Sequence, residues 1–250
     1  MESKVRPRII PVLTIAGNKL VKTIQFKNPK YLGDPLNAIK IFNDKQVDEL
    51  LILDIEASEK KQKPNYDLLY EMAGEAFMPL GYGGGISSLN DAVKVFDCGF
   101  EKVVLNSILH KNKSIISEIA NVYGNQSVSV SCDIKTNLFG KTKLYFYSGK
   151  VSSSQNIEEL IAEYIKLGAG EIILNDVNRE GTFKGYNLEL IKQFSNIAVP
   201  IVALGGCHGI TDMNNALKNG ASAIAAASIF VYKNNDTNSI LINYPKTTNF

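Results

Sequence analysis

The sequence contains no tryptophan, only three cysteines and only two histidines among its 250 residues. Cys98, Cys132 and Cys207 lie far apart and form no CxxC pair, and their odd number does not suit a disulfide framework. His110 and His208 are too few and too isolated to complete a zinc site with them. These absences predict a cytoplasmic protein that binds no metal ion.

The chain also lacks a strong charge imbalance and any long apolar run. Lys and Arg number 27 and Asp and Glu number 25, so the formal net charge is +2. This excess is too small to indicate nucleic acid or an anionic membrane surface as a partner. No run of about 18 apolar residues occurs, and the apolar stretch near the N-terminus is too short and too broken for a signal peptide. We therefore expect neither nucleic acid nor a membrane as a partner.

What the chain does contain is a regular alternation of short apolar runs with longer amphipathic segments. The runs are rich in Val, Ile, Leu and Ala with little polar alternation, which is typical of parallel strands buried on both faces. They occupy residues 8–15, 49–55, 77–82, 102–106, 127–134, 171–176, 200–205 and 222–228. The intervening segments have helix signals, such as an N-cap at Asp34 followed by Pro35. Eight such units predict a single (β/α)8 barrel domain over residues 1–250.

Two stretches of this pattern resemble each other: PLGYGGGIS at 79–87 and PIVALGGCHGI at 200–210. Ser107 lies 23 residues after Gly84, and Ser228 lies 23 residues after Gly205. The two copies are offset by 121 residues, which is about half the chain. The repeat predicts a barrel built from two duplicated half-barrels.

The glycines of both copies follow directly after a strand. Glycines there let the backbone approach an anion closely, and the N-terminus of the following helix presents free N–H groups. The candidate anion-binding residues are Gly84, Gly85, Asn106 and Ser107 in the first copy, and Gly205, Gly206, Ala227 and Ser228 in the second. A single glycine pair is more often only a tight turn. Two such cradles at one barrel mouth favour a ligand that carries two phosphates.

Other polar residues fall at the same ends of the predicted strands. Asp54, Asp133, Asn175 and Asp176 end strands, where the active sites of barrel enzymes lie. The first loop carries four lysines, at positions 19, 22, 27 and 30. Any one of these lysines alone suits a solvated surface loop, whereas together they favour a basic lid over an anionic ligand.

Several stretches together carry a resemblance to a known family. They are DELLILDIEAS, GGGI, EKVVLNS, YSGK, GAGEIILND, REGT followed by GY, and AAASIF. From Arg8 to about Phe230 the chain resembles the HisF family, the cyclase subunits of imidazole glycerol phosphate synthase. The related isomerases of the HisA family share the half-barrel duplication but fit these stretches less well.

The resemblance implies a substrate with a phosphate at each end and no organic cofactor. It implies that a separate, HisH-like glutaminase subunit supplies ammonia through the barrel from its N-terminal face. The family's ring of four charged residues at that entrance corresponds here to Arg8, Glu49, Lys102 and Glu171; a ring of ion pairs could also be structural only. At the mouth the resemblance implies anion orientation by Lys22, positioning by Asp54 and Asn175, and substrate binding by Gly181 and Thr182.

The chain departs from the family where protons are transferred. The family's catalytic pair is two aspartates, at the ends of the first and fifth strands. Asp133 keeps the second, whereas Thr14 stands in place of the first. A hydroxyl does not exchange protons near neutral pH as a carboxylate does, and the loss of such a group costs about 10²–10⁴-fold in rate. Leu204 also stands before the second glycine pair, where the family prefers a small polar residue.

Two hypotheses about function therefore stay open. In the first, the protein is an ammonia-dependent synthase and cyclase in which Asp133 is the surviving acid and base. In the second, it conducts ammonia and activates its glutaminase but does little chemistry itself. The stretch FKNPKYLGDP and the short end INYP resemble a divergent HisF-like branch found with surface-polysaccharide genes. In that branch a third protein is thought to use the ammonia for the amidination of a sugar.

Overall fold

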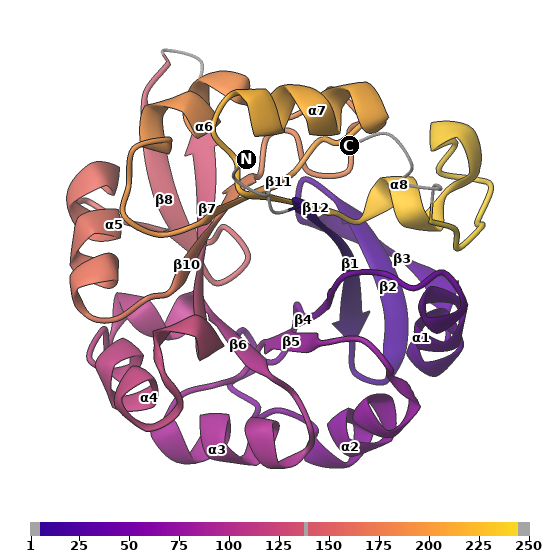
Figure 1. The fold of residues 1–250 in the computed structure, drawn as a ribbon, viewed down its shortest axis with the longest axis horizontal. Coiled ribbons are helices and arrows are strands. Elements are labelled where there is room, and N and C mark those ends of the chain that lie inside the picture. Colours follow the sequence, from indigo (N-terminus) through magenta and orange to yellow (C-terminus); the bar gives the residue numbers. More distant parts are fainter. Residues whose placement is uncertain (1–5, 138–139, 245–250) are drawn as a thin grey trace, which may run out of the picture.

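The computed structural model describes residues 6–137 and 140–244, and its strands close into a barrel surrounded by helices (Figure 1). Neighbouring barrel strands pair in parallel, β12 pairs with β1, and β7 pairs with β10, so the wall closes on itself. The barrel strands are β1 (Arg8–Ala16), β4 (Leu50–Asp54), β5 (Leu80–Gly83), β6 (Lys102–Leu105), β7 (Val128–Thr136), β10 (Glu171–Asp176), β11 (Ile201–Leu204) and β12 (Ala223–Ala226). Each predicted apolar run contributes one of them, and the predicted (β/α)8 barrel is confirmed.

Helices cover the outside of this wall (Figure 1). They are α1 (Pro35–Asp44), α2 (Tyr66–Glu75), α3 (Leu89–Asp97), α4 (Ile115–Tyr123), α5 (Ile157–Lys166), α6 (Leu188–Phe194), α7 (Ile210–Lys218) and α8 (Ser228–Val231), with 3-10 turns at Ser107–His110, Asn125–Ser127 and Lys233–Asn235. Their starts follow from local chemistry: the carboxylate of Asp34 accepts the N–H groups of Leu36 and Asn37, as its N-cap position predicts. Helix α1 then buries Ile39 and Phe42 against the wall.

The last unit is shortened. Helix α8 has only four residues, and the described chain beyond it contains one 3-10 turn, Lys233–Asn235, and no further α-helix. The ring of Tyr244 stacks on Phe230 with centroids 5.4 Å apart, and its hydroxyl donates to the carbonyl of Ile9 at 3.4 Å. Tyr244 thus covers part of the wall that a longer eighth helix covers in a regular barrel. Residues 245–250 of the polar tail lie outside the described residues.

Two antiparallel hairpins extend from the barrel, and the sequence did not predict them. The segment expected to be a long first loop forms β2 (Lys19–Ile24) and β3 (Lys27–Gly33), and β2 pairs with the end of β1. A second hairpin, β8 (Thr142–Phe146) with β9 (Val151–Ser152), extends β7. Both hairpins therefore rise from the C-terminal face of the barrel.

The apolar side chains form two separate clusters. The larger lies between the strands and the helices, and the smaller fills the inside of the barrel. The inner cluster consists of Ile10, Val12, Leu51, Val104, Ile173, Val202, Leu204, Ala223 and Ala225. Successive residues of a strand point to opposite faces, so alternate residues of each strand enter the two clusters.

The described residues also show the state of the three cysteines and the length and polarity of the helices. Cys98, Cys132 and Cys207 are free thiols, two of them buried. No helix in the described ranges is both long and apolar enough to cross a membrane.

Candidate active site at the C-terminal face of the barrel

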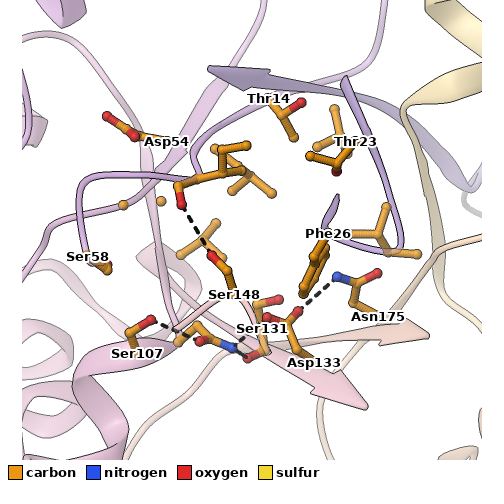
Figure 2. A pocket seen from close by; sticks show the side chains of 18 of the residues that line it. Thr14, Thr23, Phe26, Asp54, Ser58, Ser107, Ser131, Asp133, Ser148 and Asn175 are labelled. Carbon is orange, nitrogen blue, oxygen red and sulfur yellow. Dashed lines mark hydrogen bonds between the residues drawn. The ribbon is translucent and has the colours of Figure 1, made fainter. Parts of the chain in front are cut away.

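A cavity opens among the C-terminal ends of the barrel strands, and most of the predicted site residues line it (Figure 2). Those in its wall are Thr14, Lys22, Asp54, Gly84, Gly85, Asn106, Ser107, Asp133, Asn175 and Ala227. A smaller adjoining cavity is lined by Lys22, Gly181, Gly205, Gly206, Ala227 and Ser228. Thr182 lines neither cavity, because its hydroxyl turns away and donates to the carbonyl of Arg179 at 2.7 Å. The predicted site residues thus line two adjoining cavities that share Lys22 and Ala227.

The first glycine pair is required by close backbone approach. Gly84 has a φ of 133°, and a side chain there would place its Cβ 2.6 Å from the carbonyl oxygen of Asp54. The hydroxyl of Ser107, in the same wall, accepts the N–H of Tyr147 at 3.1 Å. Only glycine fits at position 84, and its lack of a side chain leaves the backbone of the cavity wall exposed there.

The second glycine pair repeats this geometry. Gly205 has a φ of 99°, and a Cβ there would lie 2.6 Å from the carbonyl oxygen of Asp176. Ser228 begins α8 just beyond the next strand, as Ser107 begins a 3-10 turn in the first copy. The two copies found in the sequence therefore adopt corresponding conformations at two places around the mouth.

Asp133 is a buried carboxylate in the wall of the larger cavity. Its Oδ1 accepts the side-chain amide of Asn175 at 2.8 Å, and its Oδ2 accepts that of Asn106 at 3.2 Å. Burial raises the pKa of Asp133 to about 7, although hydrogen bonds from Asn175 and Ser131 act in the opposite direction. A carboxylate with a pKa near neutrality can both give and take a proton at that pH.

Thr14 lies across the cavity from Asp133 (Figure 2). Its hydroxyl donates to the carbonyl of Val21 on β2, so the side chain binds the first hairpin to β1. The wall therefore presents a threonine hydroxyl across from Asp133. That Thr14 stands in place of a catalytic aspartate stays a prediction.

The remaining acidic strand ends have local partners. The carboxylate of Asp54 accepts the N–H groups of Glu56 and Ala57 at 2.9 and 3.0 Å, and burial raises its pKa. Asp176 accepts the side-chain amide of Asn187 at 2.7 Å and lies 3.6 Å from the guanidinium of Arg179. Both carboxylates order the loops around the mouth.

Only one of the lysines expected to form a basic lid lines a cavity in the described residues. Of the four lysines in the first hairpin, only Lys22 lines a cavity, while Lys19, Lys27 and Lys30 are exposed. Lys30 instead donates to the carbonyl of Thr237 at 2.6 Å. Lys30 is the cross-strand partner of Lys22 and Lys27 is that of Ile24, so strand alternation alone does not separate these lysines, and the basic lid stays a prediction.

Lys22 itself forms a buried ion pair that the sequence did not indicate. Its ammonium bonds to the carboxylate of Glu180, and the side chains are 3% and 11% exposed. Glu180 also accepts the hydroxyl of Thr23 at 3.3 Å and the N–H of Phe26 at 3.1 Å. Glu180 lies within the stretch REGT but is 158 positions from Lys22 in the chain, so no local signal connects the two. This carboxylate holds the tip of the first hairpin against the cavities.

Serine hydroxyls in the wall were missed as well. Ser58 accepts the N–H of Gly85 at 3.1 Å, and Ser148 donates to the carbonyl of Ile55 at 3.2 Å. Ser131 lies two residues before Asp133 on the same strand (Figure 2). Period-two alternation along β7 was the signal that could have identified Ser131.

The opposite end of the barrel is closed by a ring of four charged side chains. Arg8 bonds to both Glu49 and Glu171, and Lys102 reaches the same two carboxylates at 2.7 and 3.1 Å. Burial raises the pKa of Glu171 but is outweighed by Lys102 and Arg8, which hold it below its ordinary value. Cations and anions therefore alternate around the ring at the N-terminal ends of the strands.

Comparisons with known proteins agree with this architecture. The family described as Histidine biosynthesis protein matches residues 8–237. A protein of Leptospira borgpetersenii, named "Putative imidazole glycerol phosphate synthase subunit HisF", is 45% identical over 97% of this chain and 96% of its own length. A Pseudomonas aeruginosa protein with the same name and the designation hisF2 is 43% identical over 96% of both chains. The imidazole glycerol phosphate synthase subunit HisF of Helicobacter hepaticus is 36% identical over 90% of both.

Proposed function

This chain belongs to the histidine biosynthesis protein family, and we propose that it is a HisF-type synthase subunit acting on a bis-phosphorylated ribonucleotide. In this proposal ammonia comes from a HisH-like glutaminase that docks at the N-terminal face. The proposal rests on the position of Asp133, a buried carboxylate in the cavity that holds the first glycine pair, next to a second cavity that holds the corresponding pair.

The two cradles would hold the ends of the substrate. The first presents the backbone of Gly84 and Gly85 with the hydroxyl of Ser107, and the second presents Gly205 and Gly206 with Ser228. Backbone N–H groups and hydroxyls bind phosphate without adding a competing side chain. The reacting part of the substrate, between its two phosphates, would then lie within reach of Asp133.

Asp133 would carry the proton transfers. When the nitrogen of ammonia bonds to a substrate carbon it must lose a proton, and the Asp133 carboxylate accepts that proton. The protonated acid can return it to a leaving or ring-closing atom of the substrate. The amides of Asn175 and Asn106 hold both carboxylate oxygens and so fix the direction of transfer.

The charged ring would admit ammonia from the glutaminase. Arg8, Glu49, Lys102 and Glu171 close the barrel floor, and the apolar cluster above them favours neutral ammonia over the ammonium ion. Opening requires one ion pair to separate, which a docked partner can promote.

The test is turnover with ammonium chloride in place of the glutaminase. Purified protein receives the bis-phosphorylated aminoimidazole-carboxamide ribonucleotide precursor that HisF subunits use, and product is followed by chromatography. We expect binding of the substrate and slow product formation that the variant Asp133→Asn abolishes. Failure of the substrate to bind, measured by calorimetry, would reject the proposal.

A second candidate function is favoured by Thr14. Without a second carboxylate opposite Asp133, the protein could serve as an ammonia-conducting partner that activates its glutaminase for the amidination of a sugar by a third protein. Stimulation of glutamine hydrolysis without any ammonium-driven turnover would favour this function over the first. Neighbouring genes for nucleotide sugars rather than for histidine synthesis would point the same way.

A further inference from the structure

Strand β7 places a column of polar side chains inside an otherwise apolar barrel. Ser129, Ser131 and Asp133 alternate along the strand, and all three are buried. The intervening Val128, Val130 and Cys132 belong to the cluster under the helices. Six of the other seven barrel strands contribute the apolar residues of the inner cluster.

The lower end of this column reaches the charged ring. The hydroxyl of Ser129 donates to Oε1 of Glu171 at 2.8 Å, and Ser129 is fully buried. Its hydroxyl thus touches the ring from inside the barrel, just above the place where the ion pairs close the floor.

The upper end reaches the candidate active site. Ser131 lines the wall of the larger cavity beside Asp133, two residues before it on β7 (Figure 2). Asn175, on the neighbouring strand β10, donates to Asp133, while its own Oδ1 is buried without a hydrogen-bond partner in the described part of the chain. A buried acceptor without a partner is a position where an N–H donor is stabilised.

The spacing of the column matches the size of ammonia. Alternate residues of a strand are about 6.6 Å apart, and two successive hydrogen bonds through one small molecule span about 6 Å. Ammonia both donates and accepts, and a serine hydroxyl does the same. One molecule can therefore bridge adjacent members of the column while the apolar walls offer it no competing partner.

We propose that Ser129 and Ser131 form a hydrogen-bonding lane that carries ammonia from the charged ring to Asp133, with Asn175 Oδ1 as its last acceptor. The lane rests on the proposed function, because it needs a glutaminase that delivers ammonia at the ring. It assigns the route to one strand and two hydroxyls rather than to the apolar interior as a whole.

The lane is tested with two variants of nearly equal shape. Ser131→Val removes the hydroxyl, and Ser131→Thr keeps it. The measured quantity is the rate with glutamine and the glutaminase divided by the rate with ammonium chloride, which enters from the open mouth. We expect this ratio to fall about fivefold in Ser131→Val, the loss of one hydrogen bond, and to return toward the wild-type value in Ser131→Thr.

A control variant distinguishes loss of a hydroxyl in the lane from loss of a serine hydroxyl elsewhere in the barrel. Ser117 donates to the carbonyl of Leu167 at 2.9 Å in the outer helix layer, so Ser117→Val loses a hydroxyl far from the interior and is expected to leave the ratio unchanged. Equal ratios for Ser131→Val and Ser131→Thr would overturn the lane.

A crystal structure of the protein alone gives an answer that does not depend on turnover. Water has the hydrogen-bonding character of ammonia, so the lane should hold ordered solvent within 2.7–3.2 Å of Ser131 Oγ and Asn175 Oδ1, and Ser131→Val should lose it. A dry wild-type interior would overturn the lane. Absence of glutamine-driven turnover in the wild type would count against the proposed function, and the solvent positions would then decide the lane by themselves.

Discussion

The side-chain amide of Asn175 donates to Oδ1 of Asp133 at 2.8 Å in a fully enclosed part of the cavity wall. This contact favours the ionised carboxylate, whereas the surrounding protein favours the neutral acid, and burial is the larger effect. The outcome is a pKa of about 7. Asp133 is thus a group whose charge changes with pH inside a barrel that otherwise stays the same.

This shift makes Asp133 a source of pH-dependent stability. Its folded pKa is raised above the unfolded value of 3.8, so the contribution it makes is fully present below about pH 4 and is lost as pH rises to about 7. The variant Asp133→Asn has no such loss. Relative to the wild type it should gain in free energy of unfolding between pH 4 and pH 8, by at most about 4 kcal/mol.

Urea unfolding of both proteins at pH 4.5 and pH 8 measures this difference. Asp54 has a raised pKa and Glu171 a lowered one, so both also make stability depend on pH. Because the variant and the wild type share these two groups, their contributions cancel in the difference between the two proteins. A constant difference across the pH range would show that Asp133 titrates at its ordinary value.

The ion pair between Lys22 and Glu180 predicts that Glu180 fixes the hairpin of β2 and β3 to the barrel. Glu180→Ala leaves a buried ammonium unpaired and should lower the free energy of unfolding by about 3 kcal/mol or more. It also removes the acceptor of the Phe26 N–H, so hydrogen exchange at that amide should become faster. Glu180→Gln keeps an acceptor oxygen and should keep the protection in part.

The lack of tryptophan helps to follow this hairpin. Phe26→Trp introduces a single tryptophan in the cavity wall, and acrylamide should quench its fluorescence more strongly when Glu180 is replaced by Ala. Glu59→Gln is the matched control, because Glu59 forms an exposed ion pair with Lys150 on the same face. Equal quenching in Phe26→Trp alone, with Glu180→Ala and with Glu59→Gln would show that Glu180 does not hold the hairpin in place.

The charged ring predicts that the variant Lys102→Ala uncouples glutamine hydrolysis from product formation. Lys102→Ala leaves Glu49 and Glu171 with Arg8 as their shared cation, so one closing contact disappears while the barrel stays folded by circular dichroism. Product formed per glutamine hydrolysed should fall, because ammonia is no longer retained at the floor. Lys40→Ala removes an exposed lysine paired with Glu75 and serves as the control. An unchanged ratio for Lys102→Ala would leave the ring a structural feature.

An exposed phenylalanine lies on the face where we propose that the glutaminase docks. Phe77 is 90% exposed and lies in the connection that leads into β5, at the same end of the barrel as Lys102 and the neighbouring Glu101. Phe77→Asp should weaken binding of the glutaminase at least about tenfold, since exposed aromatic residues often dominate an interface. Tyr70→Asp, on the outer surface of α2, is the control. Calorimetric titration with the partner decides between them.

The sequence predicted the barrel because its strands carry a strong and local signal. Residues 171–176 form β10 with the same boundaries as predicted, since three consecutive apolar residues that follow a glycine and end at Asn175 and Asp176 leave few alternatives. The hairpin of β2 and β3 has no such signal: β3 is almost wholly exposed and polar, and Gln25 and Phe26 at its turn have positive φ. Its conformation comes from contacts with Glu180, far away in the chain.

The candidate site was predictable to the same extent. Gly84 and Gly205 were recognisable because a glycine directly after a buried strand has few other reasons to be there. Substrate binding by Thr182 stays a prediction: Gly181 before it has a φ of 74°, and the Thr182 hydroxyl donates to the carbonyl of Arg179. The partners of Lys22 and Asp133 are set by the closure of the barrel, which no local pattern contains.

Thr14 leads to the last prediction, the recovery of a second carboxylate. In Thr14→Asp the new side chain loses the bond to the carbonyl of Val21, and its charge turns toward the cavity, across from Asp133. Two carboxylates that face each other raise one pKa and leave the other low, so that one serves as acid and the other as base. Ammonium-driven turnover of the HisF substrate should therefore rise at least about tenfold over the wild type. The rise stays partial because Leu204 narrows the same wall. Thr14→Asn has the same shape without the charge and should give no rise. Robust turnover by the wild type would contradict the argument directly, because Asp133 would then suffice without a partner across the mouth.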